Sequence, residues 1–95
     1  MYHILICDDQ VDIVNALKIY LAPEGYQLYE AFNGRQALEI LKQETIHLVL
    51  LDVMMPVMDG ITATARIREF SNIPIEDMEY IHSLFEKYGG AFPCI

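Results

Sequence analysis

The chain has 95 residues, 54% of them apolar, and its 6 Lys and Arg residues face 14 Asp and Glu residues, giving a formal net charge of −8. This length predicts one small domain, which buries only roughly 60–65% of its unfolded surface and has little stability to spare. The acidic balance argues against a surface for nucleic acid or anionic membranes, because either would need a cationic patch.

Neither a targeting signal nor a membrane span is predicted. The first seven residues lack a cationic leader and meet Asp8, and Asp52 interrupts the apolar residues well short of the roughly 18 that a span needs. We therefore expect a cytoplasmic protein without a membrane segment. Cys7 lies in an apolar run and Cys94 near the end of the chain, so we expect buried or free thiols rather than a disulfide.

Three strand and helix units are predicted in series. The expected strands are short apolar runs at residues 2–7, 26–31 and 47–51. The expected helices have a 3.6-residue apolar period and cover residues 11–21, the segment from the Asn33-Gly34 turn to about residue 42, and residues 61–70 with Asp59 as N-cap. Because parallel crossovers are right-handed and run through helices, these units predict a parallel α/β layer.

The pattern changes after Phe70. Residues 71–75 begin like a fourth strand, but Glu76 and Asp77 interrupt it, and we expect a helix over about residues 75–88. Its predicted apolar face consists of Met78, Ile81, Leu84, Phe85 and Tyr88. His82 falls on the opposite, polar face, and with His3 and His47 it is expected to be a surface or strand-end residue. None of these histidines has the spacing of a metal site.

Acidic residues follow the first and third predicted strands: Asp8 and Asp9 close the first, and Asp52 closes the third. A single aspartate at a strand end is usually a turn residue or a helix cap. Ligands of open parallel sheets bind at the carboxyl ends of the strands, so we expect these carboxylates to meet at one edge. Oxygen ligands suit Mg²⁺ better than zinc or copper, and beside such an ion a carboxylate can attack phosphorus.

The acidic pair, the lone aspartate and the run from Asp52 to Gly60 resemble the receiver domains of two-component response regulators. The resemblance covers residues 1 to about 75 and includes the turn at residues 31–34. It implies a truncated flavodoxin-like, three-layer αβα sandwich with parallel sheet order 2-1-3, a stub of strand four and a C-terminal amphipathic helix. Residues 1–75 would form a partial receiver domain of three βα units, and residues 76–95 a divergent tail.

The resemblance also assigns roles to residues. Asp52 is the phosphoacceptor, Asp9 and Asp52 ligate Mg²⁺ with the backbone carbonyl of Met54, and Asp8 reaches the ion through water. A sensor histidine kinase would supply the phosphoryl group. The chain would be a phosphorelay module rather than an enzyme, with at most weak self-phosphorylation and dephosphorylation.

Two positions depart from the family. Glu79 stands where the fourth strand of the family ends in Thr or Ser, and the family's switch lysine would lie beyond Ile95, so we expect impaired phosphoryl transfer. The alternative is a non-catalytic protein that sequesters a kinase or regulator through the receiver surface, with Asp52 idle. With strand four reduced to a stub, strand three at residues 48–51 would become an exposed edge. We expect a homo-oligomer formed through that edge or through the tail helix.

Overall fold

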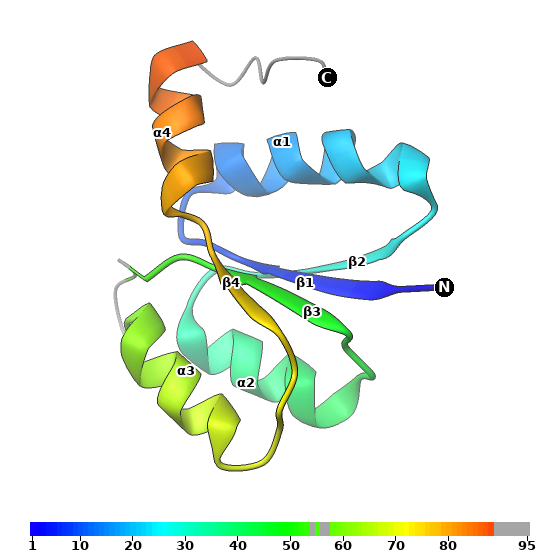
Figure 1. Ribbon diagram of the computed structural model, residues 1–95, viewed down its shortest axis with the longest axis vertical. Coiled ribbons are helices and arrows are strands. Elements are labelled where there is room, and N and C mark those ends of the chain that lie inside the picture. The colour runs from blue at the N-terminus through cyan, green and yellow to red at the C-terminus, as the bar shows by residue number, and fades with distance from the viewer. Residues whose placement is uncertain (54, 56–57, 89–95) are drawn as a thin grey trace.

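Four parallel strands form the central sheet of the protein. The structure is a computed structural model. It describes residues 1–53, 55 and 58–88, apart from the side chains of residues 80, 84, 85 and 88. The strands are β1 (His3–Cys7), β2 (Gln27–Ala31), β3 (Leu48–Leu51) and β4 (Ile75–Asp77). The helices are α1 (Val11–Leu21), the 3-10 helix η1 (Ala22–Glu24), α2 (Gly34–Gln43), α3 (Gly60–Arg68) and α4 (Glu79–Tyr88). Figure 1 shows α1 and α4 on one face of the sheet and α2 and α3 on the other.

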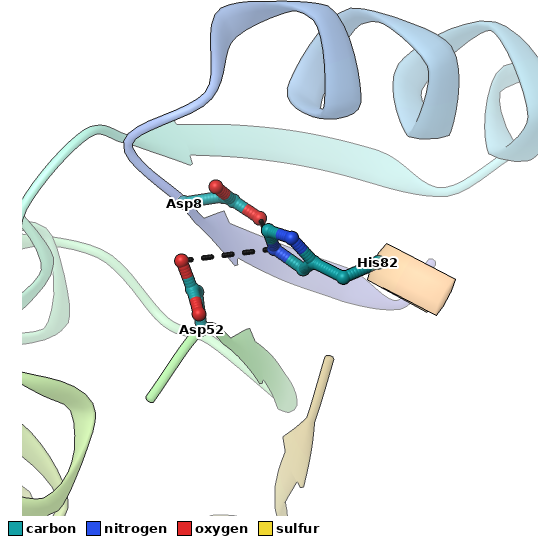
Figure 2. Close-up of side chains that lie close together, drawn as sticks. All are labelled: Asp8, Asp52 and His82. Atoms are coloured by element: carbon teal, nitrogen blue, oxygen red, sulfur yellow. Dashed lines mark hydrogen bonds and ion pairs between the residues drawn. The ribbon is translucent and has the colours of Figure 1, made fainter. Parts of the chain in front are cut away.

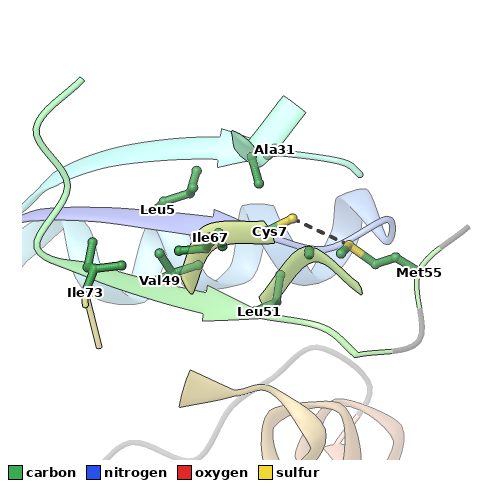
Figure 3. Packing of buried hydrophobic residues seen from close by; sticks show 10 residues of the cluster. Leu5, Cys7, Ala31, Val49, Leu51, Met55, Ile67 and Ile73 are labelled. Atoms are coloured by element: carbon green, nitrogen blue, oxygen red, sulfur yellow. Dashed lines mark hydrogen bonds between the residues drawn. The ribbon is translucent and has the colours of Figure 1, made fainter. Parts of the chain in front are cut away.

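Apolar clusters cover both faces of the sheet, because successive side chains of a strand point to opposite faces. The cluster toward α2 and α3, drawn in Figure 3, contains the buried residues Leu5, Cys7, Ala31, Ala37, Val49, Leu51, Met55, Ala63, Ile67 and Ile73. The cluster toward α1 contains the buried residues Ile4, Ile6, Ile13, Val14, Leu17 and Met78. The prediction that the first and third strands are covered on both faces is confirmed, and so is the three-layer fold.

The predicted helix start near residue 75 is wrong. Ile75–Asp77 is strand β4, which pairs in parallel with β3 through Val49 and Ile75 and through Leu51 and Asp77, and α4 begins only at Glu79. The side chains of Glu76 and Asp77 are exposed. A strand at the edge of a sheet can carry such charges, because its pairing uses backbone groups alone.

Strand β3 is therefore not an edge, and the expected association through an exposed third strand is wrong. The sheet order is β2-β1-β3-β4, so β4 occupies that edge. Met78, just before α4, is a buried member of the cluster beneath α1, and Ile81 within α4 packs against that cluster in the same chain. The predicted burial of Leu84, Phe85 and Tyr88 lies outside the described side chains, and association through α4 stays a prediction.

Candidate functional site

The register of the central strands brings Asp8 and Asp52 to the same edge of the sheet. Cys7 pairs with Leu51, and the backbone N–H of Asp52 donates a hydrogen bond to the carbonyl oxygen of Cys7 at 2.9 Å. Both aspartates follow directly after this pair, and both are buried, with exposed fractions of 0% and 5%. The structure thus places these two carboxylates together, as expected for the carboxyl ends of neighbouring parallel strands.

A pocket of about 340 Å³ opens at this edge and is lined by Asp9, Gln10, Asp52, Val53, Glu79 and His82. Asp9 is exposed and forms part of the pocket wall, whereas Asp8 lies buried behind it. The backbone carbonyl of Met54, the remaining predicted metal ligand, lies outside the described residues.

His82 reaches into the site, and its prediction as a surface residue is wrong. Its Nε2 lies 2.6 Å from Oδ2 of Asp8 and 3.6 Å from Oδ2 of Asp52, so that the imidazole approaches both carboxylates (Figure 2). Helix side chains lean toward the helix N-terminus, and α4 starts immediately after the end of β4. A residue one turn into α4 therefore reaches back over the edge of the sheet. The prediction missed this position of His82 because it considered only whether the residue falls on the polar or the apolar face of the helix.

Burial dominates the electrostatics of Asp8. It raises the pKa of the Asp8 carboxyl above its ordinary value of 3.8, and the negative charge of Asp52 adds to this effect. Two contacts oppose the rise: the backbone N–H of Gln10, which donates to Oδ1 of Asp8 at 2.9 Å, and the imidazole of His82. Burial, reinforced by the nearby carboxylates, also raises the pKa of the Cys7 thiol to about 12. The pocket therefore favours a positively charged occupant.

The loop after β3 is held in place by the start of α3. The side chain of Asp59 accepts a hydrogen bond from the backbone N–H of Thr62 at 2.7 Å, which lowers the pKa of Asp59 and confirms it as the N-cap. The N–H of Gly60 donates to the carbonyl oxygen of Val53 at 3.1 Å. A Cβ at Gly60 would lie 2.4 Å from Cα of Val53 and 2.6 Å from the carbonyl oxygen of Asp52. This close approach requires glycine.

The side chains of the site fit a hard divalent cation. Asp8 and Asp52 supply buried carboxylates, and Asp9 supplies another at the pocket wall. Mg²⁺ binds one or two protein carboxylates and keeps several of its waters, for which the open pocket has room. Among the described residues, Asp8, Asp52 and His82 each place one ligand atom within 4.8 Å of the other two. The site therefore offers oxygen ligands and, unexpectedly, one nitrogen.

Residues 4–78 match the response regulator receiver domain family, and the chain belongs to that family. It is 42% identical over 72 residues to the transcriptional regulatory protein SrrA of Staphylococcus aureus, an alignment that covers 76% of this chain and 30% of that protein. The chain spans about a third of the length of the curated relatives it matches.

Two solved structures resemble the fold. The response regulator protein TrrA of Thermotoga maritima in complex with Mg²⁺-BeF has a TM-score of 0.77 and 30% identity, covering 96% of this chain and 79% of that one. A structure of histidine kinase ThkA in complex with TrrA gives a TM-score of 0.76 and 35% identity, with 81% and 67% of the two chains covered. These findings confirm the predicted flavodoxin-like receiver fold. Receiver domains are phosphoacceptor modules.

Within the described part of the chain, no helix is long and apolar enough to cross a membrane.

Proposed function

We propose that the chain accepts a phosphoryl group on Asp52 from a sensor histidine kinase, with Mg²⁺ in the adjoining pocket. The observation that carries this proposal is the pair of buried carboxylates, Asp8 and Asp52, beside an open pocket. Buried like charges are costly, and a divalent cation offsets that cost while leaving one carboxylate oxygen able to attack phosphorus. Membership of the receiver family and the complex of TrrA with a histidine kinase support this class of donor.

Each carboxylate has a separate role in the proposal. Asp9 and Asp52 would ligate Mg²⁺ together with the backbone carbonyl of Met54, and Asp8 would hold the ion through water. When bound, the ion neutralises charge on the transferring phosphoryl group. The bond from an Asp52 carboxylate oxygen to phosphorus forms as the phosphorus–nitrogen bond to the kinase histidine breaks. The Mg²⁺ in the TrrA complex supports this choice of metal.

Transfer should be slow, because Glu79 lines the pocket. By the resemblance this residue stands where the family carries Thr or Ser at the end of the fourth strand, but the structure makes it the first residue of α4, two positions after β4 ends at Asp77. A hydroxyl would donate a hydrogen bond to a phosphoryl oxygen, whereas a carboxylate repels it. We therefore expect Glu79→Thr to accelerate phosphorylation.

The test is phosphate incorporation, measured by intact mass after incubation with Mg²⁺ and acetyl phosphate or a purified kinase. Wild type should gain one phosphoryl group, and Asp52→Asn or removal of Mg²⁺ with EDTA should abolish the gain. Asp59→Asn is the matched control, because it removes a nearby carboxylate while asparagine can still cap α3. This control should incorporate phosphate as wild type does.

Two results would refute the proposal. Incorporation into Asp52→Asn at the wild-type rate would place the acceptor elsewhere. A complete lack of incorporation into both wild type and Glu79→Thr would favour the alternative, in which the receiver surface sequesters a kinase or regulator and Asp52 is idle.

A further inference from the structure

His82 adds to the acidic pocket a type of ligand that carboxylates do not supply. Its Nε2 approaches one carboxylate oxygen of Asp8 and one of Asp52, at 2.6 Å and 3.6 Å, and the three ligand atoms lie within 4.8 Å of one another (Figure 2). Ligand atoms about 2.1 Å from a metal ion, at angles of about 90–109°, are about 3.0–3.4 Å apart. Shifts of about 1 Å would therefore let the three atoms surround one ion.

We propose that the pocket is a mixed nitrogen and oxygen site that prefers a divalent transition metal ion, represented by Zn²⁺, over Mg²⁺, and that Nε2 of His82 is the discriminating ligand. Mg²⁺ takes oxygen ligands and keeps much of its water, whereas an imidazole suits zinc, iron, nickel and copper. The inference concerns the same pocket as the proposed function, and it rests on the metal-binding half of that function rather than on phosphoryl transfer.

The surroundings of His82 support a ligand role. Its other ring nitrogen, Nδ1, lies 3.5 Å from the side-chain amide nitrogen of Gln10. In this arrangement Nε2 donates to Oδ2 of Asp8 at 2.6 Å, and Nδ1 faces the amide nitrogen. With the amide turned by 180°, its oxygen would accept a proton on Nδ1, and the lone pair of Nε2 would then be available to a metal. Ile81 packs against the cluster beneath α1, so the histidine is carried on a helix that is docked on the core. A ligand fixed in this way loses little freedom when a metal binds.

Calorimetric titration of the full chain with Zn²⁺ and, separately, with Mg²⁺ tests the proposal, in a Cys94→Ser background so that this thiol does not bind zinc. Wild type should bind Zn²⁺ more tightly than Mg²⁺. His82→Ala should weaken Zn²⁺ binding at least about 100-fold, because changes outside the ligand shell already cost 10–100-fold. The same variant should change Mg²⁺ binding by less than about threefold, because nitrogen is not a preferred ligand of that ion.

His47→Ala is the matched control. This histidine directly precedes β3, at the opposite end of the strand from Asp52, so its removal should leave the affinities for both ions unchanged. Nuclear magnetic resonance of the histidine rings gives a second readout on the unmutated residue, because Zn²⁺ should shift the ring signals of His82 and not those of His47. This measurement decides the question even if His82→Ala fails to fold.

Equal Zn²⁺ affinity of wild type and folded His82→Ala, or His82 ring signals unmoved by saturating Zn²⁺, would overturn the proposal. Tighter binding of both ions by His82→Ala would also overturn it, since His82 would then be a competitor of metal ions rather than their ligand. The titrations contain no phosphoryl donor. Failure here therefore leaves phosphorylation of Asp52 untouched, and a failure to incorporate phosphate leaves the zinc result standing.

Discussion

Replacing Gly60 by alanine tests how closely the start of α3 packs on the backbone that carries Asp52. The added Cβ would lie 2.4 Å from Cα of Val53 and 2.6 Å from the carbonyl oxygen of Asp52, whereas ordinary contacts begin at 3.4 Å. The backbone would have to retreat by about 1 Å, since no flexible side chain can move instead. Overpacking costs about 1–3 kcal/mol, and a backbone clash belongs at the upper end. Alanine regains at most about 1 kcal/mol of helix propensity, so we expect a net loss of about 2 kcal/mol.

Urea and thermal unfolding followed by circular dichroism would measure this loss, which corresponds to a fall of about 8–16 °C in Tm for a domain of this size. Movement of the same backbone should also weaken the proposed binding of Mg²⁺ at Asp52. Ile61→Ala is the control, because Ile61 is the next residue of the helix and is 75% exposed, so its removal should change stability by less than about 0.5 kcal/mol. If Gly60→Ala were as stable as Ile61→Ala and bound Mg²⁺ normally, the packing argument would be refuted.

Two titratable groups at the pocket give further predictions. Because burial raises the pKa of Asp8 above 3.8, the folded chain holds this proton more tightly than the unfolded chain, and stability falls as the pH rises through the raised pKa. Without divalent ions, Asp8→Asn should therefore have a higher Tm than wild type at pH 7, with a difference that shrinks below about pH 4; equal Tm values at pH 7 would contradict this. The buried Cys7 thiol, with its pKa raised to about 12, should react with iodoacetamide at pH 8 only as fast as the chain opens, and rapidly in denaturant. Alkylation of native Cys94→Ser protein as fast as in denaturant would exclude such burial.

Much of the fold could be predicted because its strands and helices are buried in regular patterns. Strand β3 is a continuous apolar run, and β1 is apolar after its first residue, His3, as expected where helices cover both faces of a sheet. The bounds predicted for α1, residues 11–21, agree with the structure, since Pro23 and Gly25 stop the period just beyond it. The proximity of the Asp8 and Asp52 carboxylates could be predicted by the same reasoning, because both residues come directly after adjacent parallel strands.

Strand β4 could not be predicted from its side chains. Of its three residues, Glu76 and Asp77 are exposed and only Ile75 is partly buried, so the hydrophobic period that identifies a strand is absent. Its formation depends on backbone pairing with β3, a long-range contact that no local pattern records. The position of His82 depends in turn on β4, because that strand places the start of α4 at the carboxyl edge of the sheet.

The contacts of His82 link the occupant of the pocket to the docking of α4. Asp8 and Asp52 lie outside the two apolar clusters, so these carboxylates are not part of the core that stabilises the fold. Burial makes the charge of Asp8 costly, so its contribution to stability differs in kind from that of the core. His82 bonds to Asp8 from the helix that Ile81 packs against the core. An ion that keeps His82 as a ligand must therefore stabilise the docked helix, and an ion that displaces the imidazole must weaken it, because linkage between binding and conformation is reciprocal. At the proposed site, the choice between a transition metal and magnesium would therefore, through this histidine, also affect how firmly α4 is held.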